Sequence, residues 1–408
     1  MLTAFFKSLF LSTLYLQDIT PYSKYKFLSR FFLSNIFMRL LFLAFSLLCA
    51  VNGFCQKKIL LISTYDSPKS EGIYVFEFND LDGSVKELSH VKTSNSSYIA
   101  ISPNKKYVYA VNENANITGK GGSVTSFVFD KENGILTKIN TQSSQGNHPC
   151  YISVDKAGKW IVTGNYSSGN FAVLPVNKNG ELLPASQIIQ HYGKSFDTSR
   201  QNSPHVHATV VSKNNKLLYV TDLGTDKIMI YNFDGKTGKV TASFPEFIST
   251  PAGSGPRHLD ISPDNMFMYV VQELSGNIAL YSLKNKSFKE LQTISNLPAN
   301  FKGAAGSADI HISPDGNFLY ASNRGQLNTI VIYRINKITG HITYITQQPT
   351  LGLAPRNFNF DPSGKYLLVA NQNSNEVVIF KRNIKTGLLT DTGKRISVGK
   401  PVCIKWMQ

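Results

Sequence analysis

A repeat of about 50 residues limits the possible fold of this chain more than any other feature. Six segments align without gaps over twelve residues, including "SPNKKYVYAVNE", "SPDNMFMYVVQE" and "SPDGNFLYASNR". They start at residues 102, 155, 212, 262, 313 and 361, at spacings of 53, 57, 50, 51 and 48 residues. Repeats of roughly this period are typical of solenoids, propellers and arrays.

Each unit has the same internal order, which indicates four antiparallel strands. A short alternating strand such as "YISV" is followed by a Pro/Asp/Asn/Gly turn and a buried-looking strand such as "YVYAV". A polar loop then leads to a third strand such as "KIMIYNF", and a second tight turn such as "KTG" opens a fourth. Four such strands per unit make a propeller blade. No helical periodicity competes after residue 58.

The two ends of the chain complete the count of blades. Residues 59–95 supply the second to fourth strands of a unit, and "PVCIKW" at 401–406 supplies a first strand with nothing after it. Pairing the two protects edges that would otherwise aggregate. We therefore predict an all-β, seven-bladed β-propeller over residues 56–408, with four antiparallel strands per blade and the ring closed by the C-terminal strand in the first blade.

Residues 1–55 differ from the rest and predict an N-terminal extension with a signal peptide at about 38–55. Arg39 precedes the apolar run "LLFLAFSLLCAV", and Gly53 and Cys55 stand at the −3 and −1 positions of a cleavage site. The run is shorter than the ~20 residues of a membrane-spanning helix. We expect a periplasmic or secreted protein with no stable membrane span after cleavage. A retained anchor is the alternative, and the protein is cytoplasmic if the leader is not part of the natural chain.

The net charge of +16 is spread along the chain. The leader holds five basic residues and one acidic residue, so its removal leaves about +12. The lysines are distributed over the turns without a block of five or six. A nucleic-acid site needs clustering, so we expect no nucleic-acid partner. A small-molecule substrate that carries negative charge would fit the basic surface.

One face of the predicted ring carries the varied chemistry. The turns between strands one and two and between strands three and four have similar sequences in every unit. The loops on the opposite face vary in sequence from unit to unit, as loops that carry a functional site do. The innermost strands begin with Ser97, Cys150, His207, Arg257, Ala308 and Arg356. The second strands are followed by Glu113, Tyr166, Leu223, Glu273, Arg324 and Gln372. Both rings should line the mouth of the central channel, which is the default place for a ligand.

Five stretches closely resemble the bacterial lactonase family of seven-bladed propellers. They are "SPHVHATVV", "GPRHLDISPD", "VQELSGNI", "ADIHISPDGNFLYASNRG" and "APRNFNFDPSGKYLLVANQNSNEVVIF". The resemblance covers about residues 58–406. The family includes a 6-phosphogluconolactonase and a fungal cycloisomerase that forms a muconolactone. The resemblance implies a lactonase, a carboxylic ester hydrolase of carbohydrate metabolism, that uses no metal or other cofactor.

The resemblance also implies a catalytic set of His207, Arg257 and Glu273. By residue type, Glu273 is a general base if partial burial raises its pKa. Arg257 is a fork of donors for an oxyanion. His207 donates to the carbonyl oxygen or protonates the leaving hydroxyl. Each also has a structural interpretation: His207 as a strand cap, and Arg257 with Glu273 as an ion pair within one blade.

Other polar residues near these motifs have lesser predicted roles. Substrate-binding candidates are Arg324, Arg356, Asn323 and His205. His205 and His207 lie two apart on a strand, but two ligands are too few for a zinc or calcium site. Strand alternation predicts that Arg257 points to the channel while His258 points away and is structural.

Two other functions compete with hydrolysis. A cycloisomerase acting on a carboxylated lactone would use the same pocket, and a non-enzymatic propeller would present a flat rim to a partner. The chain has no Gly-x-Ser-x-Gly elbow of serine hydrolases. A cleaved signal peptide would separate the protein from cytosolic 6-phosphogluconolactone and favour an unphosphorylated lactone outside the cytoplasm.

Overall fold

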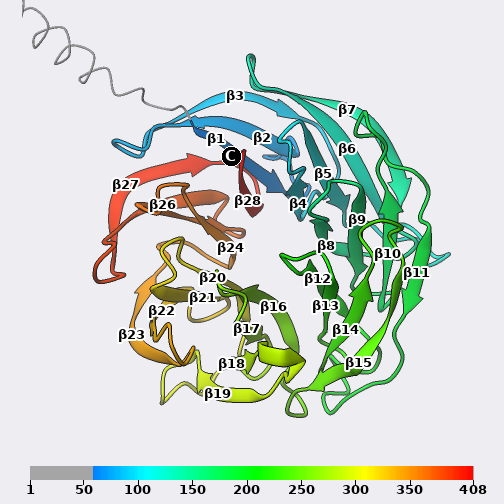
Figure 1. Cartoon of the computed structure of the whole chain (residues 1–408). Helices are drawn as coiled ribbons and strands as arrows, with labels where there is room; N and C mark the ends of the chain where they lie inside the picture. Colours follow the sequence, from blue (N-terminus) through cyan, green and yellow to red (C-terminus); the bar gives the residue numbers. More distant parts are fainter. Residues whose placement is uncertain (1–57, 408) are drawn as a thin grey trace, which may run out of the picture. The chain divides into compact units, whose positions relative to one another are not determined.

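The computed structural model describes residues 58–407, which form seven four-stranded antiparallel sheets arranged in a ring (Figure 1). The predicted seven-bladed propeller is therefore confirmed. The predicted extension and signal peptide at 1–55 lie outside the described residues. The one helical element described is a 3₁₀ turn at Lys284–Lys286, and no helix of the described part is long and apolar enough to cross a membrane.

The blades follow one another along the chain, and each runs from an inner strand beside the channel to an outer strand. The first comprises β28 (Pro401–Met407), β1 (Lys58–Thr64), β2 (Ile73–Phe78) and β3 (Val85–Val91); the second β4 (Ile99–Ile101), β5 (Tyr107–Asn112), β6 (Ser123–Asp130) and β7 (Ile135–Ser143). The third comprises β8 (Pro149–Val154), β9 (Trp160–Asn165), β10 (Asn170–Pro175) and β11 (Gln187–Gln190); the fourth β12 (Val206–Val211), β13 (Leu217–Asp222), β14 (Lys227–Phe233) and β15 (Val240–Ser249). The fifth comprises β16 (Pro256–Ile261), β17 (Phe267–Gln272), β18 (Asn277–Ser282) and β19 (Glu290–Ser295); the sixth β20 (Ser307–Ile312), β21 (Phe318–Asn323), β22 (Thr329–Ile335) and β23 (Ile342–Pro349); the seventh β24 (Pro355–Phe360), β25 (Tyr366–Asn371), β26 (Glu376–Arg382) and β27 (Leu389–Ser397).

The C-terminal strand closes the ring as the sequence predicts. β28 pairs antiparallel with β1, with Leu60 opposite Trp406 and Ile62 opposite Ile404. Figure 1 shows β28, in red, beside β1, in blue. All four of these side chains are buried in one apolar cluster, so the two ends of the described chain share a core. β1 is paired on both sides, with β28 and β2, and has no open edge.

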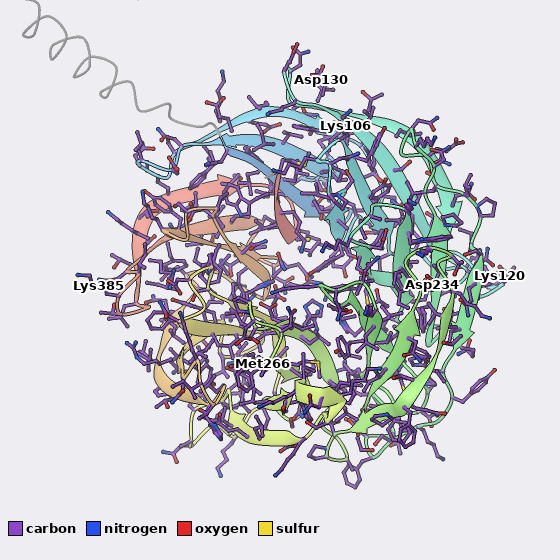
Figure 2. All side chains as sticks on the ribbon, viewed as in Figure 1. Lys106, Lys120, Asp130, Asp234, Met266 and Lys385 are labelled. Carbon is purple, nitrogen blue, oxygen red and sulfur yellow. The ribbon has the colours of Figure 1, made fainter. Side chains whose placement is uncertain are left out.

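The apolar cores lie between neighbouring blades. One cluster joins Tyr269 and Val271 of β17 to Ile310 and Leu319 of the next blade. The Tyr269 hydroxyl donates a hydrogen bond of 2.6 Å to the Gly340 carbonyl oxygen of that blade, and Gly340 has a φ of +76°. Charged turn residues such as Asp130 and Lys385 lie at the outer edge of the ring (Figure 2). The interior is therefore apolar between the blades and polar where the innermost strands meet.

The innermost strands carry an irregularity that positions the site. In six blades the pairing of the first strand with the second skips the residue near its start. In the fifth blade Pro256 pairs with Gln272 and His258 with Val271, so Arg257 is skipped. His207 and Arg356 are skipped in the same way in the fourth and seventh blades. Such bulges redirect side chains and are frequent next to active sites.

Candidate active site

Glu273 lies at the centre of a group of three arginines at the channel mouth. It follows the end of β17 and is buried. Its Oε2 lies 2.8 Å from Arg257 Nε and 2.9 Å from Arg324 Nη2, and its Oε1 accepts a hydrogen bond of 2.7 Å from Arg200 Nη2. We call these four residues the arginine cluster. With three positive charges and one negative charge, the arginine cluster has a net charge of about +2.

The arginine cluster keeps Glu273 ionised. Burial alone would raise the pKa of this carboxyl, but the charges of Arg324 and Arg257 and the hydrogen bond from Arg200 outweigh burial and lower the pKa far below its usual value. A general base needs a pKa nearer the working pH. The condition on which Glu273 was expected to act as a base is therefore not met, because opposite charges outweigh desolvation.

Arg257 is the least accessible member of the cluster. Its side chain is 1% exposed, and its Nη1 donates a hydrogen bond of 2.5 Å to the Ala308 carbonyl oxygen. Its Nε is close to Glu273 but is not aligned as a hydrogen bond to any acceptor. Burial and the charges of Arg324 and Arg356 lower the pKa of Arg257 to about 10, which still leaves the guanidinium charged at neutral pH. It is a fixed positive charge.

A second, electrically balanced group lies across the mouth. The Tyr65 hydroxyl donates a hydrogen bond of 2.7 Å to Glu113 Oε2, and Arg356 Nη2 lies 3.8 Å from the same oxygen. The Arg356 guanidinium also lies over the Tyr65 ring, 5.3 Å from its centroid. Glu113 therefore restrains Arg356 from one side only, and the side chain of Arg356 stays 15% exposed.

The predicted histidines lie in the fourth blade and contact Tyr166. His205 stacks on the Tyr166 ring, with centroids 4.4 Å apart, and its Nδ1 lies 2.9 Å from the Tyr166 carbonyl oxygen. His207 contacts the same ring edge-on at 5.6 Å, and its Nδ1 lies 3.8 Å from Cys150 Sγ. Burial and the charge of Arg257 lower the pKa of His207 well below its usual value. His207 is therefore neutral, and no acidic side chain among residues 58–407 is hydrogen-bonded to it.

The prediction that His258 points away from Arg257 is wrong. A small cavity in the channel is lined by Ser97, Tyr98, Cys150, His207, Arg257, His258, Arg356, Asn357 and Val402. Its free volume of about 10 Å³ is room for about one water molecule. The bulge at Arg257 breaks the strand alternation, so two consecutive side chains, Arg257 and His258, both reach this cavity.

Asn323 is not brought to the arginine cluster. It is fully buried, its Nδ2 donates to the Asn296 carbonyl oxygen at 2.6 Å, and its Oδ1 accepts from Asn296 and Ser307. Asn112, Asn165 and Asn371 end the second strands of their blades and make the corresponding bond to the loop that enters the blade. The side chain of Asn323 therefore ties the loop that enters its blade to the end of β21.

Arg200 is a functional candidate that sequence reasoning missed. It lies in the connection 191–205 between β11 and β12, which is the longest connection between two blades of the described chain. Its Nη2 contacts both Glu273 and, at 3.4 Å, the Tyr166 hydroxyl. With a side chain 42% exposed, it is the most accessible guanidinium of the cluster. Arg200 lies outside the segments that align between repeats and outside the stretches that resemble the lactonase family, so neither signal points to it.

The family model described as lactonase, 7-bladed beta-propeller, matches residues 59–406. The chain belongs to this lactonase family. It is 38% identical over 328 residues to a 6-phosphogluconolactonase of Formosa agariphila, covering 79% of this chain and 92% of that one. It is 35% identical to a 6-phosphogluconolactonase of Bacillus subtilis, covering 86% and 99%. Among solved structures, the periplasmic gluconolactonase of Pseudomonas aeruginosa matches with a TM-score of 0.81 at 36% identity, covering 86% and 98%.

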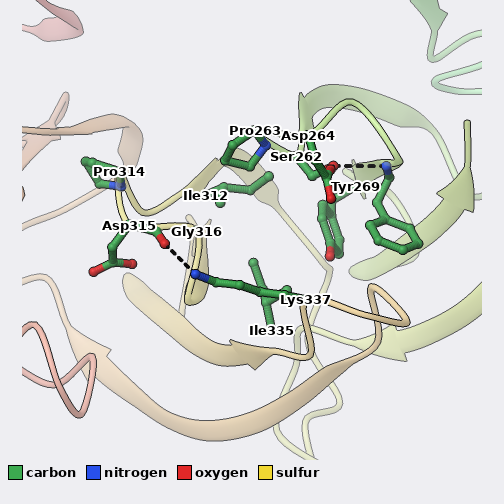
Figure 3. Close-up of a pocket in the computed structure, with 11 residues that line it drawn as sticks. Ser262, Pro263, Asp264, Tyr269, Ile312, Pro314, Asp315, Gly316, Ile335 and Lys337 are labelled. Carbon is green, nitrogen blue, oxygen red and sulfur yellow. Dashed lines mark hydrogen bonds between the residues drawn. The ribbon is translucent and has the colours of Figure 1, made fainter.

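This lactonase also has a groove on the opposite face, between the fifth and sixth blades. Figure 3 shows its lining, in which Lys337 Nζ donates a hydrogen bond of 2.9 Å to the Asp315 carbonyl oxygen. A second groove is lined by the corresponding turns of the second and third blades. Because grooves lined by the same uniform turns occur at two separate junctions between blades, we attribute them to the repeat.

Within residues 58–407, no three His, Cys, Asp or Glu side chains converge so that they could hold a metal ion. His205 and His207 in particular are used in contacts with Tyr166 and Cys150. The charges available to a substrate at the mouth of the lactonase channel are those of its arginines.

Proposed function

We propose that the protein hydrolyses the lactone of a sugar acid, of the 6-phosphogluconolactone class, to the open hydroxy acid. The observation that carries this proposal is the arginine cluster, which holds three guanidiniums against one carboxylate at the mouth of a lactonase propeller. Two relatives that the chain matches over most of their length are named 6-phosphogluconolactonase.

The chemistry of the arginine cluster suits this reaction. Water attack on a lactone carbonyl develops negative charge on the carbonyl oxygen, and donors fixed in a buried site stabilise that charge strongly. Arg257 is fixed by burial, whereas Arg324 and Arg356 remain partly exposed and can contact a substrate. The excess positive charge also attracts a phosphate or carboxylate on the substrate.

The proposal includes a location outside the cytoplasm. Its support is the leader pattern at about 38–55 and the similarity to a protein described as a periplasmic gluconolactonase. In that location the substrate would be an unphosphorylated or otherwise extracytoplasmic lactone. Cell fractionation with N-terminal sequencing of the purified protein tests this, and an intact leader on a cytosolic protein would contradict it.

A pH-stat assay of the purified protein tests the activity. We expect hydrolysis of glucono-1,5-lactone, its 6-phosphate or both, well above the rate in buffer, and loss of about 10² or more in kcat/KM for Arg257→Ala. A comparison of the two substrates at low and high salt shows whether the arginines recognise the phosphate. Rates equal to buffer for every lactone in a panel would refute the proposal.

A further inference from the structure

The neutral side chain best placed to activate water is not one of the three residues that the family resemblance implies. Glu273 is ion-paired to three guanidiniums. His207 has a thiol beside its Nδ1 and no carboxylate to orient its ring. Lactone hydrolysis still requires a group that accepts a proton from the attacking water.

His258 has the geometry of an oriented base. Its Nδ1 lies 2.8 Å from Asp309 Oδ1, and both side chains are buried. Burial alone would raise the pKa of Asp309, but His311 and His258 lower it well below its usual value. An ionised carboxylate only accepts hydrogen bonds, so Nδ1 of His258 carries the proton and Nε2 has the free lone pair.

That lone pair has no partner within the described residues. Nε2 of His258 is buried without a hydrogen bond, and the ring lines the one-water cavity together with His207 and Arg257. Another buried histidine, His191, provides a contrast: its Nδ1 lies 2.8 Å from Asp222 Oδ2, and its Nε2 is hydrogen-bonded to the Tyr231 hydroxyl at 2.9 Å. His191 thus has both ring nitrogens bonded, whereas His258 lines a cavity and keeps Nε2 unpaired.

We infer that His258 is the general base of the lactonase and that Asp309 is its positioning residue. Nε2 takes one proton from a water in the cavity as the water oxygen bonds to the lactone carbonyl carbon. The C=O π electrons move to the carbonyl oxygen, which becomes the oxyanion. Collapse of this intermediate breaks the ring C–O bond, and the proton on Nε2 passes to the leaving alkoxide oxygen. Lactone and water give the hydroxy acid, which loses its acidic proton to solvent at neutral pH.

The charges around His258 tune it for this role. Groups that face it are Asp309, Arg257, His207, Tyr98, Tyr151 and Arg356. Burial and the charge of Arg257 lower the pKa of His258 to about 4, against the opposing effect of Asp309. An anionic substrate that neutralises Arg257 and Arg356 would remove part of this positive field and make Nε2 more basic when substrate is bound.

The test uses His258→Asn in the full protein. The Asn side-chain amide can still donate to Asp309, but nothing replaces Nε2. We expect kcat to fall by about 10²–10⁴ with KM within about threefold. His191→Asn is the matched control, because it removes a buried His–Asp pair away from the cavity, and kcat should stay within about threefold. Asp309→Asn should lower kcat and change the shape of the pH–rate profile, which a purely structural role would not do.

This inference rests on the proposed function, and the outcomes separate the two. A wild-type protein that hydrolyses no lactone refutes the proposed function. An active wild type with His258→Asn at full kcat refutes the inference alone. If that variant does not fold, the solvent deuterium isotope effect on wild-type kcat decides: a normal effect is expected for a proton in flight to Nε2, and its absence overturns the inference.

Discussion

Replacing Glu273 with Gln tests whether this carboxylate holds the arginine cluster together. The variant keeps the size of the side chain but removes the only negative charge among three guanidiniums, of which Arg257 is 1% exposed. Leaving a buried charge without its partner costs about 3–5 kcal/mol. We therefore expect Glu273→Gln to lower the free energy of unfolding by about this amount.

The corresponding change in melting temperature follows from the size of the ring. The 350 residues from 58 to 407, at roughly 2.1 cal/mol/K per residue, give an unfolding entropy of about 0.7 kcal/mol/K, so a loss of about 3–5 kcal/mol lowers Tm by about 4–7 °C. Differential scanning calorimetry measures this shift. Glu132→Gln, on an exposed turn, is the control and should stay within about 0.5 kcal/mol of wild type.

Inorganic phosphate and pH add two independent measurements. With the carboxylate gone, the guanidiniums should bind phosphate more tightly, so phosphate should raise Tm more in the variant than in wild type. Because the folded pKa of Glu273 lies below its unfolded value of about 4.3, its contribution is complete above that pH and is lost as pH falls toward the folded pKa. The difference in stability between wild type and variant should therefore be constant above pH about 4.3 and narrow progressively below it. A variant as stable as wild type, with no added response to phosphate, would refute this account of the cluster.

Three further predictions test other parts of the structure. Arg200→Ala removes a side chain that is 42% exposed, so we expect less than about 1 kcal/mol of destabilisation. We also expect a lower kcat/KM for a phosphorylated lactone and a weaker dependence of kcat/KM on salt concentration. An unchanged salt dependence would exclude electrostatic steering by Arg200. His207 stays neutral in the folded protein because burial and the charge of Arg257 lower its pKa. Below pH about 6.5 unfolding therefore takes up a proton, and the free energy of unfolding decreases by up to about 1.4 kcal/mol for each unit that the pH is lowered. Denaturant titrations should show a smaller decrease for His207→Gln, and equal slopes would contradict the neutral state. Deletion of 401–408 removes β28, including the buried Ile404 and Trp406, and should give a protein that aggregates or unfolds, whereas a soluble variant with native circular dichroism would refute closure by this strand.

The fold was predictable because each repeat supplies its own four strands and turns. The ends could also be matched, since "PVCIKW" is a first strand and residues 59–95 lack one. The same alignment placed Arg257 and Glu273 on one face, and the structure joins them at 2.8 Å. Because the strand register repeats from blade to blade, residues at equivalent positions of the repeat lie at equivalent places in the ring.

The sequence did not predict two features of the site. One lies outside the repeat, and the other is a polar residue that recurs in several repeats. Arg200 lies in the longest connection between blades, outside the segments that align between repeats, so the alignment does not place it. Asn323 is a predicted substrate-binding residue, but the structure bonds it to the loop that enters its blade. Asn112, Asn165 and Asn371 stand at the same position of other repeats and make the same bond, and this recurrence is visible in the sequence. A polar residue that recurs in most blades belongs to the scaffold, and one that varies between blades belongs to the site.

The bulge in β16 shows why alternation misjudged His258 and why this matters for function. In a regular strand Arg257 and His258 would point to opposite sides. Because Arg257 is skipped in the pairing with β17, both side chains enter the channel, one toward Glu273 and one toward Asp309. The Arg–His dipeptide thus connects two carboxylates of different blades. Arg257 contacts Glu273, the carboxylate of the positively charged arginine cluster. His258 contacts Asp309 through Nδ1, which leaves Nε2 free. A single local irregularity thus brings a fixed positive charge and a candidate base to the same cavity.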